Sequence, residues 1–562
     1  MMKIKLKILF FLPVLLIVTR VHAGMYEPPK PMPADTLAIP MPGEVKIDYF
    51  HDGYNQTITM RFEQLFDFAG HIRSLTGHIR QSMNINAFDG VDNSSWFTNR
   101  NAMEKMSVES FAKGPDQGNG PDQSGKWVIT RAKTEGITPG FTIKDARGDR
   151  YVIKFDPPGY SELATGAEVV VTKLFYGMGY FVPENYLVIF NPDILQLGEN
   201  VTLVDEKGRK RNMTESDVAN ILTRIEFLPD GRIRALASKY VEGKPLGGFR
   251  YEGTRKDDPN DIIPHNFRRE MRGLEVACSW LKHFDTKAGN NLDSYIGEPG
   301  KGYIRHYLID FGSTLGSAAF APQDPYKGHE YDLDFQVMAM NVITLGMVVK
   351  KWERLPACEK PAIGIFDSWD FDPSNTRPIY PNPAFVSCTN LDGYWGAKLV
   401  NSIADDQLWA AVKTGGYTNP EDEKYIYNIL KDRRDKVGLY WYTRVCPLDF
   451  FEINNDKNLS FKDMGVTDGL WTQDESGYRY SIKVNDKVIA HNKETSQTLV
   501  PLQDYWDQVV TALQKQGNAE NQLHITLQNR NSHRKFDKKL IVHTSCSANG
   551  ENIQLLGIER EN

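Results

Sequence analysis

Short apolar runs in the middle of the chain predict a group of β-strands. Runs of four to eight residues, bounded by glycine and polar residues, are typical of strands. A glycine turn at Gly148 separates two of them, and the polar residues 198–218 are interpreted as a surface insertion. The predicted strands are 127–132, 141–144, 151–155, 180–190, 222–227 and 233–241.

Helical periodicity precedes and follows these strands. Residues 161–174 have the length and spacing of a helix, and 266–282 place Met271, Leu274 and Leu281 on one face. Residues 292–296 and 303–309 are interpreted as a hairpin. Further helices are predicted at 62–77, 337–352, 403–413, 423–434 and 502–516. Within them Arg433, Arg434 and Asp435 are interpreted as a solvated face.

From about Pro447 the pattern alternates with period two. The alternating segments are 478–484, 523–527 and 540–543, with the helix 502–516 between them. Because side chains on a strand point alternately to opposite faces, this pattern predicts a small β-rich accessory domain of sandwich type. The chain as a whole is therefore expected to have an α+β fold.

Composition narrows the function. The chain has 562 residues, of which 41% are hydrophobic and 25% charged, which is typical of a large globular enzyme. A net charge of −6 argues against nucleic acid as a partner, because phosphate-backbone binding needs clustered positive charge. Five scattered cysteines cannot form a disulfide scaffold, and no C-x-x-C is present. Cys358 and Cys388 are the pair to test for a bridge.

Residues 1–23 have the pattern of a secretory signal. Lys3, Lys5 and Lys7 precede the apolar residues 8–18, and Val21-His22-Ala23 is a small-residue cleavage site. The apolar run is shorter than the roughly 20 residues that a membrane span needs. We therefore expect an exported chain, periplasmic or extracellular, without a transmembrane segment in its mature form.

The most informative residues lie between 281 and 316. His283, Asp285, Lys287 and Asn290 follow the helix 266–282, and Asp310-Phe311-Gly312 follows the second strand of the hairpin. A carboxylate and an amide oxygen suit Mg²⁺, which prefers hard oxygen ligands. A second carboxylate five residues before the amide could accept the proton of an attacking hydroxyl. These are the parts of a magnesium-nucleotide phosphoryl-transfer site.

On these residues the chain resembles the protein-kinase-like superfamily. They match the His, Asp, Lys and Asn of H-R-D-x-K-x-x-N, and D-F-G is complete. Tyr151-Val-Ile-Lys154 is similar to V-A-I-K, and Gly136 and Gly140 lie in the loop before it. Phe284 replaces the motif's Arg, and the loop lacks G-x-G-x-x-G. Such loops resemble the divergent HipA-type and CotH-type kinases and the lipid kinases.

The resemblance implies a two-lobed fold that uses ATP with Mg²⁺, or alternatively Mn²⁺. Lys154 would bind the phosphates and Glu168 would hold Lys154, with Glu162 as the second choice. The glycine loop of Gly136 and Gly140 would cover the phosphates, and residues 240–243 would border adenine. Asp285 would be the base, Lys287 would face the phosphate, and Asn290 and Asp310 would bind the metal. His283 is interpreted as a brace for this loop.

The expected domain organisation follows from these elements. The ranges are a signal peptide (1–23), an N-terminal extension and linker (24–124), a small lobe (125–245), a large α-rich lobe (246–446) and the accessory domain (447–562). The predicted function is phosphoryl transfer to an unknown acceptor: a protein, a lipid or a small molecule. The alternatives are a silent kinase-fold binding module of the cell envelope, and an enzyme that transfers AMP or another group.

Overall fold

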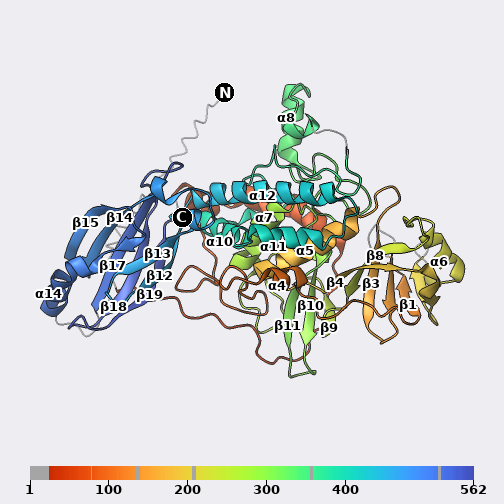
Figure 1. Ribbon diagram of the computed structural model, residues 1–562, viewed down its shortest axis with the longest axis horizontal. Coiled ribbons are helices and arrows are strands. Elements are labelled where there is room, and N and C mark those ends of the chain that lie inside the picture. The colour runs from red at the N-terminus through yellow and green to blue at the C-terminus, as the bar shows by residue number, and fades with distance from the viewer. Residues whose placement is uncertain are drawn as a thin grey trace, which may run out of the picture.

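The computed structural model describes residues 25–76, 79–132, 140–204, 210–354, 358–485, 487–516 and 521–562. The predicted signal peptide and Gly136 lie outside these residues. The described chain is elongated, with one β-sheet at one end, helices in the centre and two further sheets at the other end (Figure 1). The predicted mixture of helix and strand is confirmed.

A six-stranded sheet, in the order β4-β8-β3-β2-β1-β5, contains the predicted central strands. Strands β1, β2 and β3 follow each other in the chain and pair antiparallel with their neighbours, whereas β5 pairs parallel to β1. Aromatic and aliphatic side chains fill its buried face, as the short apolar runs predict. The strands are β1 (Trp127–Ala132), β2 (Gly140–Lys144), β3 (Arg150–Phe155), β4 (Asn185–Phe190), β5 (Leu195–Leu197) and β8 (Ile233–Lys239).

The prediction of a strand at 222–227 is wrong. Thr214 and Asp217 form a capping box that starts the helix α6 (Glu215–Leu222), and turn and irregular backbone follow it. The preceding insertion contains the hairpin of β6 (Thr202–Val204) and β7 (Lys210–Asn212). Its flanking apolar residues, including Met213, are buried in the core of the six-stranded sheet, so this insertion belongs partly to the interior.

Helix α5 (Leu163–Met178) crosses from this sheet towards the helical centre, and Asp156 fixes its start. The carboxylate of Asp156 accepts hydrogen bonds from the backbone N–H groups of Ala164 and Thr165, both at 2.9 Å. These are N–H groups that a helix leaves without an intrahelical partner. Arg234 of β8 then joins the Thr165 hydroxyl to the carbonyl groups of 415 and 416. Sheet, helix and centre are thereby held together.

The central helices pack closely around α7 (Arg269–Trp280). A Cβ atom on Gly396 would lie 2.5 Å from the carbonyl oxygen of Gly273, so only glycine permits the approach of α10 to α7. A three-stranded sheet, β11-β10-β9, lies beside them. These elements are α4 (Val108–Lys113), α9 (Pro383–Val386), α10 (Asn390–Asn401), α11 (Asp405–Lys413), α12 (Pro420–Tyr442), β9 (Lys244–Gly247), β10 (Asn291–Ile296) and β11 (Tyr303–Leu308).

Arg433 and Arg434 of α12 are buried, which corrects their interpretation as a solvated face. Arg433 donates hydrogen bonds to the carbonyl oxygens of Ser279 and Trp280, at 2.7 and 2.8 Å. Those carbonyls end α7 and have no partner within the helix. The guanidinium therefore satisfies the C-terminus of the helix that leads into the candidate catalytic loop.

The cysteine pair named for testing, Cys358 and Cys388, is not bridged. Both are free, and each thiol lies near a local carbonyl oxygen, of Lys360 and Thr389 respectively. Cys278, Cys446 and Cys546 are free and buried.

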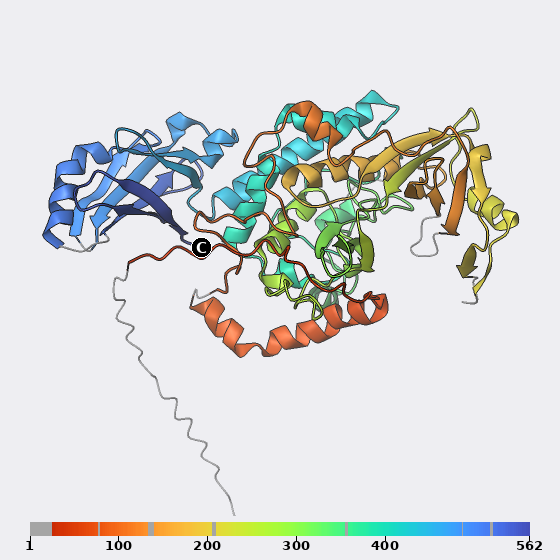
Figure 2. The same cartoon turned by 90° about the horizontal axis from the view of Figure 1, so that it is seen from below.

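The C-terminal part contains a five-stranded antiparallel sheet and a three-stranded sheet that share one hydrophobic core with the predicted helix, α14 (Figure 2). The larger sheet has the order β15-β14-β17-β18-β19, and the smaller has β12-β13-β16. Their bounds are β12 (Leu448–Ile453), β13 (Leu459–Asp463), α13 (Met464–Thr467), β14 (Gly477–Val484), β15 (Lys487–Thr495), β16 (Leu499–Val500), α14 (Trp506–Gln516), β17 (Asn521–Arg530), β18 (Leu540–Cys546) and β19 (Ile553–Arg560).

The N-terminal residues run along the molecule and join its parts. Tyr26 stacks on His543 of β18, with ring centroids 3.9 Å apart. Asp89 lies between Arg269 of α7 and Arg560 of β19, all three of them buried. Helices α1 (Tyr49–Tyr54), α2 (Met60–Phe66) and α3 (Phe68–Leu75) form an arm outside the centre, and α8 (Phe335–Thr344) projects separately (Figures 1 and 2). Among the described residues, no helix is both long and apolar enough to cross a membrane.

We predict that Asp89→Asn lowers the free energy of unfolding by about 3 kcal/mol at pH 7, because it leaves two buried guanidinium groups without their shared anion. Burial alone would raise the pKa of Asp89. The charges of Arg269 and Arg560 outweigh this effect, so the pKa of Asp89 lies below its ordinary value. A carboxyl group whose pKa is lower in the folded than in the unfolded protein stabilises the fold at pH values above its unfolded-state pKa. This stabilisation is lost as the pH falls through the folded-state pKa. The difference in free energy of unfolding between the parent and Asp89→Asn, measured by urea unfolding, should therefore be smaller at pH 3 than at pH 7.

The control is Asp230→Asn, whose carboxylate is exposed and pairs only locally with Arg232. Its unfolding midpoint should match the parent's at both pH values. Equal midpoints for Asp89→Asn and the parent at pH 7 would contradict a structural role for the buried carboxylate.

Candidate active site

A cavity of about 730 Å³ lies between the six-stranded sheet and the loop that follows α7. This volume is within the range of small-molecule sites, roughly 300–1,000 Å³. Its wall combines one face of β2 and β3, the chain after β8, and the two candidate motifs. The lining includes Arg131, Thr142, Val152, Lys154, Tyr240, Val241, Lys287, Asn290, Leu292 and Asp310.

Lys154 of β3 is the central charge of this cavity. Its Nζ atom lies 2.7 Å from Oε1 of Glu168 and 2.8 Å from Oδ1 of Asp310. Burial alone would lower the pKa of Lys154, but Asp310 and Glu168 together raise it above its ordinary value. The amine is therefore a fixed cation, and the predicted ion pair between Lys154 and Glu168 is present.

The three partners differ in exposure. The side chain of Glu168 is 3% exposed and that of Lys154 is 15% exposed, whereas that of Asp310 is 43% exposed. Glu168 therefore faces only the interior, and Asp310 presents carboxylate surface to the cavity. The second choice, Glu162, accepts a hydrogen bond from the backbone N–H of Thr418 at 3.1 Å. That contact engages Glu162 at the start of α5 and not at the lysine.

Gly140 lies directly beside the lysine strand. It begins β2 and pairs in register with Lys154, so its backbone is adjacent to the cavity wall. Gly136, its predicted companion, is not among the described residues. Residues 240 and 241 line the cavity where the predicted adenine edge was placed.

The loop after α7 is held in shape by its own side chains. The Nζ atom of Lys287 lies 2.9 and 3.0 Å from the two carboxylate oxygens of Asp285. The side-chain amide of Asn290 donates to the backbone carbonyl of Asp285 at 2.7 Å. Because Nδ2 makes this bond, the side-chain oxygen of Asn290 is the atom that can face a cation.

Asp310 joins the second motif to this loop under backbone strain. The residue has φ 64°, a left-handed conformation that is uncommon outside glycine, although aspartate tolerates it better than most residues. The N–H of the preceding Ile309 donates to the carbonyl of Asn290 at 3.1 Å. Phe311 stacks on Phe175 of α5, with centroids 5.0 Å apart. Strained residues of this kind cluster at functional sites.

His283 lies under the loop, where a bracing role would require it. Its ring meets the rings of Phe175 and Phe311 edge-on, with centroids 6.4 and 6.0 Å away. Burial lowers its pKa, so the ring is neutral at pH 7. Phe284, where the family motif has Arg, is buried, and its carbonyl accepts from the N–H of Ile379.

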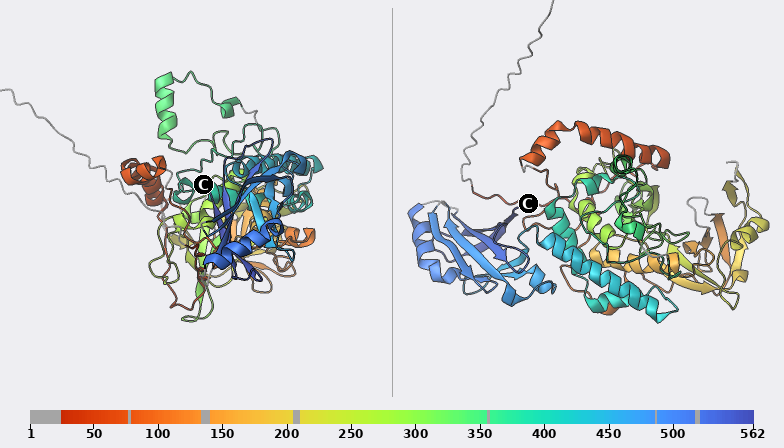
Figure 3. Two further views of the ribbon diagram at one scale, coloured as in Figure 1. Left: turned by 90° about the vertical axis from the view of Figure 1, so that its left-hand side faces the viewer. Right: turned by 90° about the horizontal axis from the view of Figure 1, so that it is seen from above.

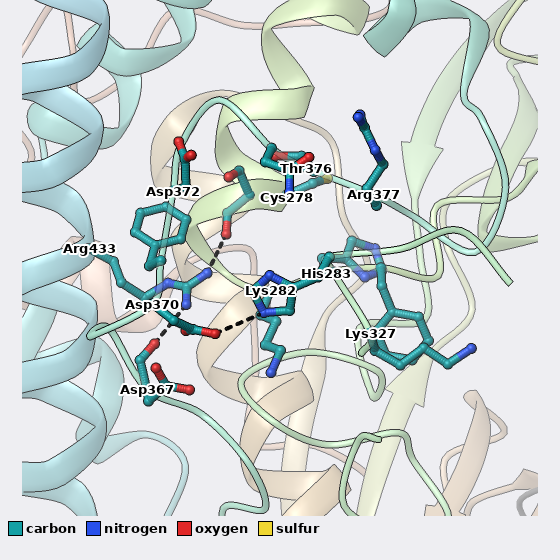
Figure 4. Close-up of a pocket in the computed structure, with 16 residues that line it drawn as sticks. Cys278, Lys282, His283, Lys327, Asp367, Asp370, Asp372, Thr376, Arg377 and Arg433 are labelled. Atoms are coloured by element: carbon teal, nitrogen blue, oxygen red, sulfur yellow. Dashed lines mark hydrogen bonds and ion pairs between the residues drawn. The ribbon is translucent and has the colours of Figure 1, made fainter. Parts of the chain in front are cut away.

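A second, smaller cavity lies behind this loop (Figure 4). It contains about 30 Å³ and is lined by Lys282, His283, His329, Asp370 and Arg433, among others. The Nε2 atom of His329 lies 3.3 Å from Asp370, and burial lowers the pKa of His329 to about 4. A space of this size suits a single water molecule and no substrate, so these residues support the loop from behind.

Sequence reasoning missed several residues of the cavity wall. Val152 lies two residues before Lys154 on the same strand, so period-two alternation could have placed it on the same face. Thr142 is on the neighbouring strand, opposite Val152 in register. Arg131 lies next to the segment of Gly136, and no pattern singled it out. Among the described residues, no three His, Cys, Asp or Glu side chains form a metal-binding group.

We predict that Glu168→Gln lowers the pKa of Lys154, because one of the two carboxylates that stabilise its charged form is lost. Each unit by which the pKa falls makes the reactive neutral amine about tenfold more abundant. Labelling with an amine-specific reagent at pH 9, read at Lys154 by mass spectrometry, should therefore be faster in the variant. Glu162→Gln is the matched control and should label like the parent. Equal rates for Glu168→Gln and the parent would contradict the assignment of Glu168.

No protein-family model and no curated protein sequence matches the chain. A Helicobacter pylori proinflammatory kinase, CtkA, aligns with 54% of this chain and 94% of its own, at 14% identity and a TM-score of 0.29. The Golgi casein kinase aligns with 72% of this chain and 96% of its own at 10% identity, with a TM-score of 0.22, and of 0.21 with Mn/ADP bound. These solved structures are kinases, but the likeness is too low to carry an argument. The function must be argued from the site.

Proposed function

We propose that this chain is a phosphotransferase with a two-lobed kinase-like fold that uses ATP and Mg²⁺, or Mn²⁺. The observation that carries the proposal is the ion-paired group of Lys154, Glu168 and Asp310 at the wall of the 730 Å³ cavity. The lobes would be residues 125–245 and 246–446, with 447–562 as an accessory domain. Export to the periplasm or the cell exterior remains part of the proposal.

The charges around Asp310 favour a divalent cation, while Arg131 and Lys239 elsewhere in the cavity wall favour phosphates. Lys154 carries one positive charge against the two carboxylates of Glu168 and Asp310, and Asp285 is balanced by Lys287. The group therefore has an excess of one negative charge, on the side where Asp310 is exposed. A divalent cation would balance this charge, and the cation would in turn attract phosphates.

The donor atoms fit magnesium in particular. Asp310 offers a carboxylate oxygen and Asn290 an amide oxygen, both hard ligands, and both residues line the cavity. Magnesium commonly takes only one or two protein ligands and completes its shell with phosphate and water oxygens. A site with two protein ligands is therefore sufficient. Bound there, the ion would neutralise charge on the transferring phosphoryl group.

The remaining residues have separate tasks in this proposal. Lys154 would hold phosphate oxygens with a positive charge that Asp310 and Glu168 maintain against the effect of burial. The backbone of Tyr240 and Val241 would border the base. Asp285 would accept a hydrogen bond from the acceptor hydroxyl and take its proton. Lys287, which is paired with Asp285, would face the transferring phosphate. His283 would keep the loop in position without taking a proton.

We predict that ATP together with Mg²⁺ raises the unfolding temperature of residues 24–562, and that neither raises it as far alone. At a concentration about a hundred times the dissociation constant, binding to the native state adds about 2.7 kcal/mol. Asp310→Ala should abolish the Mg²⁺-dependent part of the rise. Asp324→Ala, which removes an exposed carboxylate further along the same segment, should leave it unchanged. A full rise in Asp310→Ala would show that the metal binds elsewhere.

We predict that Asp285→Asn keeps the thermal shift but loses group transfer by about 10²–10⁴-fold, the usual contribution of a general base. The assay uses ATP labelled at the γ- or the α-phosphate, with the protein itself, a cell extract and lipid vesicles as acceptors. Only the γ-label should be transferred. Transfer of the α-label would replace this proposal with AMP transfer, and nucleotide binding without any transfer would favour a binding module.

A further inference from the structure

Helix α8 and the residues after it project from the body of the molecule (Figure 1). Residues 335–349 contain no Asp, Glu, Lys, Arg or His, and none of them is buried. Large apolar side chains dominate the outer end of the segment. Ile343 is 78% exposed, Leu345 82% and Met347 76%. An uncharged apolar projection of this kind is rare on a protein that stays surrounded by water.

The distribution of these side chains indicates what surrounds them. Successive residues of a helix point about 100° apart, and Met338, Met340, Val342 and Ile343 are all about half exposed or more. At this spacing the four side chains span about 200° of the helix circumference, with Asn341 and Thr344 on the remaining side, so the apolar surface is wider than one stripe but does not close around the helix. A protein partner covers one face of a helix and leaves a polar face to water, whereas the apolar layer of a membrane surrounds a projection on all sides.

The residues at the base of the projection combine charges of both signs with a tryptophan, and Asp332, Asp334 and Glu353 lie among its cations. Lys350, Trp352 and Arg354 follow the apolar segment within five residues. Tryptophan and cationic residues are favoured at the level of the lipid headgroups. The base is firmly attached, because Lys350 pairs with Glu330 at 2.7 Å and Trp352 stacks on His329 with centroids 4.9 Å apart.

A second apolar surface lies beside this base. The arm of α1–α3 contacts the chain just before α8, where the guanidinium of Arg61 lies 5.0 Å from the centre of the Tyr331 ring. Arm and projection lie on the same side of the molecule in both views of Figure 3. An amphipathic arm next to an apolar projection is suited to lie along a membrane surface. Its large exposed side chains are Phe50, Tyr54, Phe62, Phe66, Phe68, Ile72 and Leu75.

We propose that residues 335–349 insert into the apolar layer of a lipid bilayer without crossing it, and that the arm of α1–α3 lies along the same surface. This contact goes beyond the proposed phosphotransfer and needs no nucleotide. It is also connected to the candidate catalytic loop. Tyr380 donates to Asp52 of the arm at 3.3 Å, and the neighbouring Ile379 binds the carbonyl of Phe284, next to Asp285.

The test is flotation of residues 24–562 with vesicles of phosphatidylcholine, with and without phosphatidylglycerol. The parent should float with the vesicles, with little dependence on phosphatidylglycerol, because the base of the projection carries charges of both signs. The double variant Ile343→Asp with Leu345→Asp places two charges in the apolar layer and should weaken vesicle binding by more than about tenfold. Val488→Asp is the matched control, because Val488 is 53% exposed on β15 in the C-terminal sheet, and it should bind like the parent.

The outcomes separate this proposal from its competitors and from the enzyme function. Because both substituted positions are exposed, the double variant should keep the parent's unfolding temperature and its response to ATP with Mg²⁺. A parent that does not bind vesicles, or a double variant that binds like the parent, would overturn the proposal. A third outcome is a parent protein that does not bind vesicles but is a dimer in analytical ultracentrifugation, while the double variant is a monomer. This result would assign the segment to contact with a second copy of the chain.

Discussion

The candidate site depends on one buried cation, the amine of Lys154. An ammonium group removed from water is costly unless anions replace the lost hydration, and here two carboxylates do so at 2.7 and 2.8 Å. The two carboxylates come from residues 14 and 156 positions away in the chain. The pairing therefore brings a strand, a helix and a strained turn to one point. Asp310 keeps its left-handed backbone because this contact and the packing of Phe311 hold it from both sides.

Helix α5 is what makes this convergence possible. Glu168 and Phe175 are seven residues apart, nearly two full turns, so they lie on the same face of the helix. One carries the carboxylate for Lys154, and the other carries the ring on which Phe311 stacks. The start of the helix is fixed by Asp156, immediately after the lysine strand. Strand and helix are thus set relative to each other within a dozen residues of sequence.

The local parts of this arrangement were predictable from the sequence, and the distant ones were not. Short apolar runs located the strand of Lys154, helical spacing located the helix of Glu168, and the order of His283, Asp285, Lys287 and Asn290 located the loop of Asp285. The strand expected at 222–227 was wrong because a capping box at 214–217 starts a helix just before it. Arg433 looked like a surface residue because the carbonyl groups that accept its hydrogen bonds, at the end of α7, are more than 150 residues away.

In the part of the chain that the structure describes, buried charges in the interior have partners, whereas the exposed apolar side chains of the projection do not. Inside, guanidinium groups such as Arg269 and Arg560 are buried against a carboxylate, so the cost of burial is offset by a partner. On α8, apolar side chains are exposed, and none of the described residues covers them. A sequence that balances its buried charges so closely has no evident reason to leave this one segment uncovered, unless its partner lies outside the chain. The base of α8 is nevertheless connected to the candidate catalytic loop, because the N–H of Asp332 donates to the carbonyl of Ile379 at 2.8 Å and the N–H of Ile379 donates to the carbonyl of Phe284, next to Asp285, at 2.9 Å.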